Sequence, residues 1–272
     1  MPDNGEAMLP LLCLERREPL KHLSWRRYVF ALVAALLLLC ACTPSTPVAP
    51  TPTPICLQES TNEIVSIDES GPKVFFSIQL PPCYAERTWA TYPVLYWTYG
   101  GISTVQQTAE QLIQHDQLSP FILVVPIGVG DYEYGTQIIE QLVPYVDAHY
   151  RTYPDRKHRS IAGISTGADV AVRTAFRAPE TFGRVGVISG GIVEYEQVEY
   201  AEWISRVPPE QWPAVLIDIG EQDALIGLAH NLAAVLDAHG VTYTFTQAPG
   251  GHNVRYWGPH METYLQWLAN DW

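Results

Sequence analysis

Positively charged residues are scarce in this chain of 272 residues. It has 16 lysines and arginines against 29 aspartates and glutamates, a formal net charge of −13, and no basic cluster. A chain of this charge is a poor match for the phosphate backbone of a nucleic acid, so we expect no nucleic-acid partner. Charged residues are only 17% of the chain and hydrophobic residues 47%, which excludes a disordered or fibrous protein.

A long apolar run is missing as well. The most apolar stretch, residues 28–39, is shorter than the roughly 20 residues that a helix needs to span a bilayer. It follows two arginines and ends in small residues, which is the layout of a secretory signal. Residues 39–42 read Leu-Cys-Ala-Cys and resemble a bacterial lipobox, whose last cysteine receives lipid and becomes the first mature residue. We therefore expect a lipoprotein-type signal peptide over residues 1–41, lipid on Cys42, and an extracytoplasmic protein anchored to the cell envelope. An uncleaved anchor helix is the alternative.

Cysteines are few. With Cys42 lipidated, Cys56 and Cys83 are left as one pair, and outside the cytoplasm they can oxidise to a disulfide. Two separate buried thiols are the alternative. No second cysteine or histidine lies at ligand spacing from either, so we expect no metal site, and we assign no cofactor. Residues 42–58 contain a run of threonines and prolines that cannot form regular structure, and we interpret them as an extended tether.

Residues 59–272 alternate short apolar runs with amphipathic stretches. Strands over residues 62–68 and 73–80 flank a turn signal and are expected to pair antiparallel. Further strands are expected over residues 94–99, 121–127, 159–164, 184–189, 213–219 and 241–247. Helices are expected over residues 104–117, 136–150, 167–177, 224–238 and 259–269, with a kink at Pro144. Apolar strands between helices indicate one α/β domain with a mixed, mostly parallel sheet that binds ligands beyond the carboxyl ends of its strands.

The sharpest local signal is the motif G-x-S-x-G, which places Ser165 between a predicted strand and a predicted helix. Gly163 and Gly167 supply the small neighbours that such a tight turn needs, so the serine stands above the sheet as a nucleophile. The helix that follows directs its amide groups and its positive dipole end at the same place. A serine that only caps the helix is the alternative.

His252 is the candidate base for this serine. It follows two glycines after the last predicted strand, where a loop can bring the imidazole over the carboxyl edge of the sheet. His260, which opens the last predicted helix, is the other candidate. The remaining histidines lie in or beside helices, before a strand, or in the signal.

A carboxylate must hold the tautomer of the base and stabilise its positive charge. Asp218, Glu221 and Asp223 crowd the end of the preceding strand. We assign Asp223, because Asp218 lies within the strand and points into a sheet face, whereas Glu221 points to solvent. The chain order Ser165, Asp223, His252 is that of α/β-hydrolases.

An acyl-transfer site also needs backbone N–H groups that bind the oxyanion. We expect one from Thr166, directly after the nucleophile, and one from Gly101, in the glycine pair that follows the strand over residues 94–99. An ordinary turn at the glycine pair is the alternative.

From residue 74 to the end, the motifs resemble the esterase family around esterase D, which includes S-formylglutathione hydrolase, feruloyl and acetylxylan esterases, enterochelin esterase and the mycolyltransferase antigens. The resemblance is carried by residues 92–96, 99–101, 150–152, 155–156, 161–168, 220–223 and 251–252, in family order. Three positions depart from the family: Tyr99 stands where a histidine is usual, Thr166 where a methionine is usual, and Ala168 where a glycine is usual.

The resemblance implies an α/β-hydrolase fold and a serine esterase that cleaves a carboxylic ester through an acyl-enzyme. Its substrate would be a small-molecule or polysaccharide-linked ester. An acyltransferase of the mycolyltransferase type and an inactive surface binding protein on a hydrolase scaffold are the alternatives.

Overall fold

The structure is a computed structural model that describes residues 59–67, 73–128 and 134–272. The predicted signal peptide, the tether, Cys42 and Cys56 lie outside these residues, so the lipid and the disulfide stay predictions. Cys83 lies in the turn after the second strand and is half-buried. Within the described part of the chain, no helix is long and apolar enough to cross a membrane.

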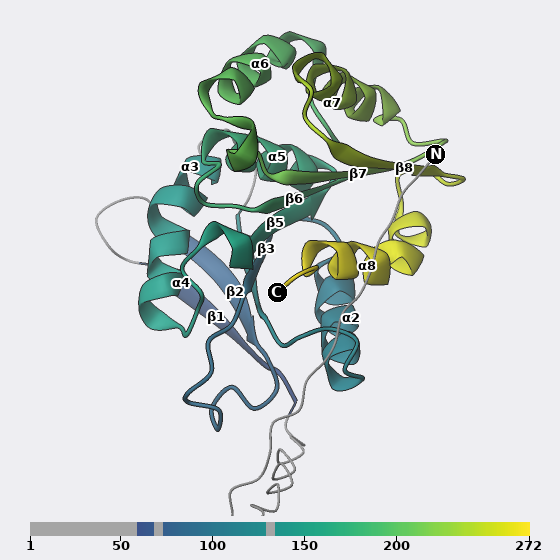
Figure 1. Cartoon of the computed structure of the whole chain (residues 1–272). Helices are drawn as coiled ribbons and strands as arrows, with labels where there is room; N and C mark the ends of the chain where they lie inside the picture. The colour runs from purple at the N-terminus through teal and green to yellow at the C-terminus, as the bar shows by residue number, and fades with distance from the viewer. Residues whose placement is uncertain (1–58, 68–72, 129–133) are drawn as a thin grey trace, which may run out of the picture. The chain divides into compact units, whose positions relative to one another are not determined.

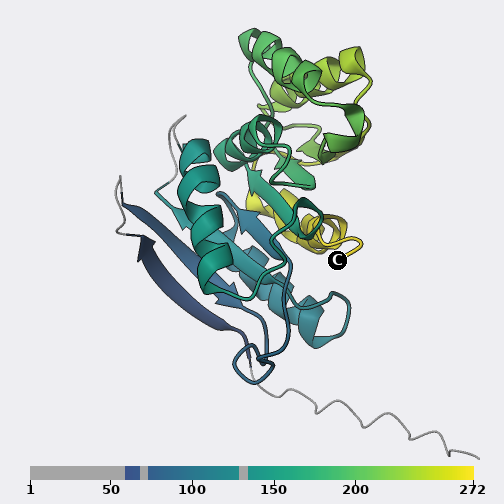
Figure 2. The same ribbon diagram turned by 60° about the vertical axis from the view of Figure 1, so that its left-hand side comes forward.

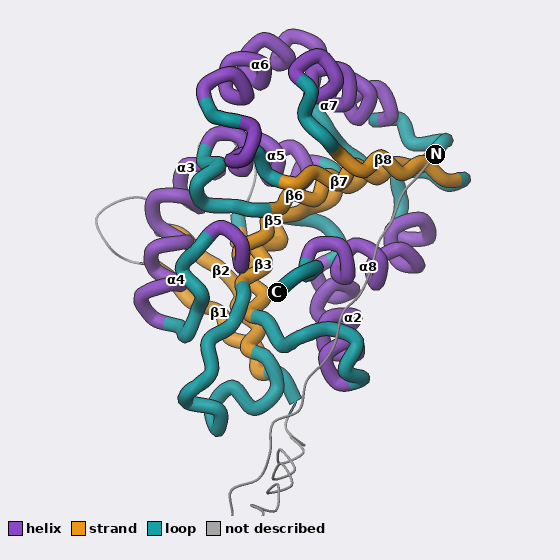
Figure 3. Tube along the Cα trace, viewed as in Figure 1, coloured by secondary structure: helices purple, strands orange, loops and turns teal. Residues whose placement is uncertain are grey.

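One eight-stranded sheet organises the described residues (Figures 1 and 3). Its strands are β1 (Thr61–Ile67), β2 (Val74–Leu80), β3 (Val94–Trp97), β4 (Ile122–Ile127), β5 (Arg159–Ile164), β6 (Arg184–Ile188), β7 (Ala214–Gly220) and β8 (Tyr243–Ala248). They lie in the order β1-β2-β4-β3-β5-β6-β7-β8. β2 runs antiparallel to both of its neighbours, β1 and β4, and all other neighbours are parallel. The predicted mixed, mostly parallel sheet is confirmed.

Helices cover both faces of this sheet (Figures 1 and 2). On one face lie α2 (Ile102–Gln114) and α8 (Val254–Leu268), which pack with Leu95 and Trp97 of β3. On the other face, with Tyr96, lie α3 (Tyr134–Gln137), α4 (Val143–His149), α5 (Thr166–Arg177), α6 (Gln197–Arg206) and α7 (Ile226–His239). Because side chains alternate along a strand and both faces are covered, β3 and β5 are buried along their whole length.

The predicted helix over residues 136–150 is interrupted. α3 runs into one π-helical turn, Ile138–Leu142, and α4 follows it. Pro144 lies in the first turn of α4, where its missing N–H removes a hydrogen bond to the preceding turn. The expected kink is therefore a local change of helix type.

The last helix begins at Val254 rather than at residue 259. The Asn253 side chain caps it by accepting a hydrogen bond from the Arg255 N–H at 3.0 Å, and Pro259 is accommodated inside it. The early start brings the first turn of α8 directly beside the loop that carries His252. α6 was not predicted from the sequence.

Candidate active site

Ser165 lies in the turn between β5 and α5, at the carboxyl edge of the sheet. Its φ of 59° and ψ of −127° form a conformation that a residue with a side chain rarely adopts. A Cβ atom on Gly163 would lie 2.2 Å from Thr98 Oγ1, and one on Gly167 would lie 2.8 Å from the Tyr99 backbone. Only glycine fits at either position, so the motif holds Ser165 in a strained, protruding turn.

The structure brings the three predicted catalytic residues into one hydrogen-bonded chain. His252 Nε2 lies 2.9 Å from Ser165 Oγ, and His252 Nδ1 lies 3.1 Å and 3.0 Å from Oδ1 and Oδ2 of Asp223. The Asp223 side chain is fully buried, whereas that of His252 is 31% exposed. When Nδ1–H donates to the carboxylate, Nε2 is left as an acceptor for the serine proton.

Hydrogen bonds join the two loops that carry Asp223 and His252. The Gln222 N–H donates to the Gly250 carbonyl at 2.8 Å, and the Gly250 N–H donates back to Gln222 Oε1 at 2.7 Å. These bonds join the loop after β7, which carries Asp223, to the loop after β8, which carries His252. Gln222 was not predicted from the sequence, where its place next to the candidate acid is the one local signal for it.

A tryptophan ring packs against the imidazole of the candidate base. The Trp257 ring in α8 meets the His252 ring edge-on, with 5.0 Å between the ring centroids. Its Nε1–H donates to Ser189 Oγ at 2.7 Å, which fixes the indole. Ser189 directly follows β6, has a φ of 48° and is fully buried. Neither residue was predicted from the sequence, because no local pattern links them.

The other candidates lie elsewhere. Asp218 is buried in β7 and accepts a hydrogen bond from Tyr264 Oη at 2.6 Å, which ties α8 to the sheet, and burial raises the pKa of this carboxyl. Glu221 is exposed, and its carboxylate accepts a hydrogen bond from Gln222 Nε2 at 3.3 Å. His260 lies inside α8, with its ring against Tyr256. Among the described residues, no group of three His, Cys, Asp or Glu side chains could hold a metal ion.

The two backbone segments that are expected to supply oxyanion donors both lie beside the nucleophile turn. Thr166 is the first residue of α5, so its N–H is among the first four amides of the helix, which have no intrahelical acceptor. Gly101 caps α2 with a φ of 61°, and a Cβ atom there would lie 3.2 Å from the side chain of Ile164, the residue before the nucleophile. The glycine pair therefore lies against the nucleophile turn, where an oxyanion donor is needed.

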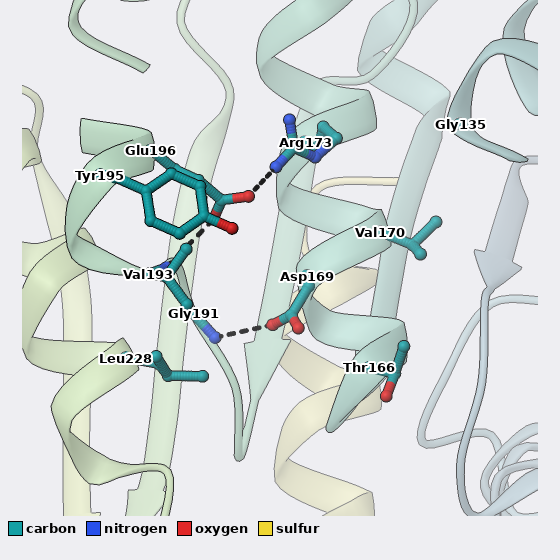
Figure 4. Close-up of a pocket in the computed structure, with 10 residues that line it drawn as sticks. All are labelled: Gly135, Thr166, Asp169, Val170, Arg173, Gly191, Val193, Tyr195, Glu196 and Leu228. Atoms are coloured by element: carbon teal, nitrogen blue, oxygen red, sulfur yellow. Dashed lines mark hydrogen bonds and ion pairs between the residues drawn. The ribbon is translucent and has the colours of Figure 1, made fainter. Parts of the chain in front are cut away.

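A pocket with a volume of about 220 Å³ begins at Thr166 (Figure 4). One wall is α5, which contributes Asp169 and Arg173, and the facing wall is the loop after β6 together with the 3₁₀ turn Glu194–Glu196. Burial raises the pKa of Asp169 to about 6, and the nearby Glu196 charge adds to this, while the Gly191 N–H and the Arg173 charge oppose it. This pocket was not predicted from the sequence.

Known proteins resemble this chain in sequence. Residues 68–268, most of the chain, match the family model described as "Putative esterase". An endo-1,4-beta-xylanase/feruloyl esterase of Xylanibacter ruminicola is 30% identical over 129 residues, which cover 40% of this chain and 18% of that protein. A protein of Mycobacterium tuberculosis named as an esterase is 32% identical over 115 residues, covering 36% of this chain and 25% of that one. The chain thus spans at most a quarter of the length of these relatives.

Solved structures show the same fold. A ferulic acid esterase superposes with a TM-score of 0.68 at 20% identity, covering 78% of this chain and 98% of that one. The feruloyl esterase module from Clostridium thermocellum superposes with a TM-score of 0.69 at 17% identity, covering 79% of this chain and 90% of that one. The S-formylglutathione hydrolase of Staphylococcus aureus superposes with a TM-score of 0.61 at 17% identity, covering 78% of this chain and 98% of that one. The fold is that of the α/β-hydrolases, and with the family match over most of its length the chain belongs to this esterase family.

Proposed function

We propose that this protein is a serine esterase that hydrolyses a carboxylic ester through an acyl-enzyme. The observation that carries the proposal is the contact of 2.9 Å between His252 Nε2 and Ser165 Oγ, with Asp223 directly behind the imidazole. Nucleophile and base lie within hydrogen-bond reach and a third group orients the base, which is the arrangement that activates a serine.

The reaction follows from this geometry. His252 takes the hydroxyl proton as Ser165 Oγ attacks the carbonyl carbon, and the oxyanion that forms is stabilised by the Thr166 and Gly101 N–H groups. The intermediate collapses, and His252 returns the proton to the departing alkoxide, which leaves the acyl group on Ser165. His252 then deprotonates a water molecule that attacks the acyl carbonyl. The bond between the acyl carbon and Ser165 Oγ breaks, His252 returns the proton to Oγ, and the carboxylic acid is released.

Hydrolysis is the preferred outcome because the site is open. Ser165 is partly exposed and almost a third of the His252 side chain is accessible, so water can reach the acyl-enzyme. Transfer of the acyl group to an alcohol of a sugar is the second candidate, since the same acyl-enzyme serves both reactions.

A panel of esters, assayed with and without an alcohol acceptor, tests both hydrolysis and acyl transfer. Purified protein is incubated with acetyl, short-chain, feruloyl and thiol esters, with and without an alcohol acceptor, and the acid and ester products are separated. We expect free acid as the main product, and none above background from Ser165→Ala. A predominantly transesterified product would assign an acyltransferase instead. No product from any ester by folded wild-type protein would favour a binding protein on this scaffold.

We also propose that the enzyme is displayed outside the cytoplasm on a lipid anchor. Support comes from the lipobox-like residues 39–42 and the proline-rich tether that follows. In that location the substrate class is an external ester, either a small molecule or an acyl group on a polysaccharide. The feruloyl esterase names of several similar proteins are consistent with this class.

A further inference from the structure

The His252 imidazole is held by hydrogen bonds at both ring nitrogens and by an aromatic contact. Ser165 Oγ lies 2.9 Å from Nε2, and the Asp223 carboxylate oxygens lie 3.0 Å and 3.1 Å from Nδ1. The Trp257 ring stands at 90° to the imidazole, with 5.0 Å between the centroids. This contact uses neither hydrogen bond, so it can persist when one of them is lost.

One of the two hydrogen bonds is lost in the proposed reaction. In the free enzyme the Ser165 hydroxyl donates to Nε2 of the neutral imidazole. In the acyl-enzyme Oγ is an ester oxygen with no hydrogen to donate, so of the three side chains Asp223 and Trp257 remain to hold the ring. A ring that is hydrogen-bonded at one nitrogen can turn about its Cβ bond, and 31% of the His252 side chain faces solvent. The Trp257 contact opposes that rotation.

The indole of Trp257 is itself fixed to the backbone around the nucleophile. Its Nε1–H donates to Ser189 Oγ at 2.7 Å. The Ser189 N–H donates to the Asp218 carbonyl in β7 at 2.8 Å, and the preceding carbonyl, of Ile188, accepts the Ser165 N–H at 2.9 Å. The segment that anchors the indole therefore also joins the nucleophile turn to the strand that leads to the catalytic acid.

Ser189 has an unfavourable backbone conformation for a residue with a side chain. Its φ of 48° lies in the left-handed region, which glycine adopts most readily. Glycines occupy the next two positions of the chain, whereas the strained position carries a fully buried serine. Strain of this kind persists where the surroundings hold it in place, and it is concentrated at functional sites. The hydrogen bond from Trp257 gives the Ser189 side chain a function there.

We propose that Ser189 and Trp257 form a positioning pair that holds the His252 imidazole in the acyl-enzyme, and that the pair acts mainly on deacylation. The inference rests on the proposed function, because it needs an acyl-enzyme. During acylation the Ser165 hydroxyl still orients the ring. During deacylation Nε2 takes a proton from the water molecule whose oxygen bonds to the acyl carbon, and a ring that has turned away cannot do so. Both residues act through His252 and touch no substrate.

Pre-steady-state kinetics with p-nitrophenyl acetate separates the two steps. Release of p-nitrophenol reports acylation, and the steady state that follows reports deacylation. Ser189→Gly removes the hydroxyl and relieves the backbone strain, and Trp257→Phe keeps an aromatic ring without the N–H. In both variants we expect deacylation to slow by at least about tenfold and acylation by less than about threefold, so that kcat and KM fall together. Loss of folded protein would lower the amplitude of the burst and leave both rate constants unchanged.

Trp267→Phe is the matched control. Trp267 lies in the same helix, ten residues further on, and packs near the Arg184 guanidinium instead of the imidazole. It should leave both rate constants unchanged. Unchanged deacylation in either Ser189→Gly or Trp257→Phe, or an equal or larger loss in acylation, would overturn the positioning pair and leave the esterase proposal standing.

A measurement without turnover separates the two proposals. Ser165→Ala lacks the proton donor for Nε2, as the acyl-enzyme does, and NMR relaxation of the His252 Cε1–H group reports the motion of the ring. We expect an ordered ring in Ser165→Ala and a mobile one when Ser189→Gly is added, with the order parameter falling from about 0.85 to below about 0.6. This change without ester turnover by the wild type would reject the esterase proposal alone. Equal order parameters in the two proteins would reject the positioning pair.

Discussion

At the residue scale, three carboxylates within six positions of the chain have different neighbours. Asp223 faces the His252 imidazole, Asp218 holds Tyr264 in the core, and Glu221 points to solvent. Their roles therefore follow from where the strand ends: a residue inside β7 points into a sheet face, and only one beyond the turn reaches the edge.

Replacing the acid without changing its shape tests this assignment. Asp223→Asn favours the wrong imidazole tautomer, which in serine proteases costs about 10⁴ in kcat, so we expect a loss of at least about 10³ here. Glu221→Gln is the neighbouring control and should change kcat less than about tenfold. Turnover is normalised to the titre of reactive serine. Near-normal turnover of Asp223→Asn would move the role of the acid to another carboxylate.

The pH dependence of stability tests the burial of Asp169. Its pKa is about 6 in the folded protein and near 3.8 in an exposed chain, so between these values the folded state binds more protons and stability falls as pH rises. The full effect is up to about 3 kcal/mol at pH 7, since one pKa unit corresponds to about 1.4 kcal/mol. The melting temperature of Asp169→Asn relative to wild type should therefore increase from pH 4 to pH 7. A difference that stays constant over this range would contradict the burial.

At the element scale, the strand–turn–helix unit around Ser165 depends on glycine at positions 163 and 167, where the surrounding atoms leave no room for a side chain. The elbow could be predicted because the tight turn and the small residues are encoded within a few neighbouring positions. The hydrogen bonds that hold the loops in place could not be predicted, because Gln222 and Gly250 are 28 residues apart in the sequence, and Trp257 and Ser189 are 68 residues apart. Such pairs are set by the sheet order, which no local periodicity encodes.

Two glycine-to-alanine substitutions, one at a crowded position and one at an open position, test the strand–turn–helix unit. Gly167→Ala would place a methyl group 2.8 Å from the Tyr99 backbone, so we expect a loss of about 1–3 kcal/mol of unfolding free energy, together with most of the activity. Gly227→Ala in α7 meets no atom within 4 Å and should leave the protein equally stable or up to about 1 kcal/mol more stable. Denaturant unfolding measures both. Equal stability of the two variants would contradict the close approach at the elbow.

At the scale of the whole molecule, the two-sided cover of helices agrees with the apolar strands of the sequence. The fold class could be predicted because continuous apolar runs need burial on both faces. The pocket at Asp169 could not, because in the sequence this residue is an ordinary polar position of a helix. Its burial comes from Gly191, which follows a different strand.

The N-terminal proposal has its own test. Mass spectrometry of membrane-extracted protein should show a lipid-modified N-terminal Cys42, and thiol titration of the unfolded, unreduced mature chain should find neither Cys56 nor Cys83. A bridge of this loop length contributes about 2–4 kcal/mol. A soluble protein that retains residues 1–27 would contradict the anchor, and two titratable thiols would contradict the bridge.

The central claim is that Ser165 is the nucleophile, and covalent labelling tests it most directly. Folded protein is treated with a fluorophosphonate, digested, and mapped by peptide mass spectrometry. We predict one adduct per chain, on Ser165, which is absent in Ser165→Ala and forms far more slowly in Asp223→Asn. An adduct on a different residue, or no adduct on the folded wild-type protein, would contradict the account.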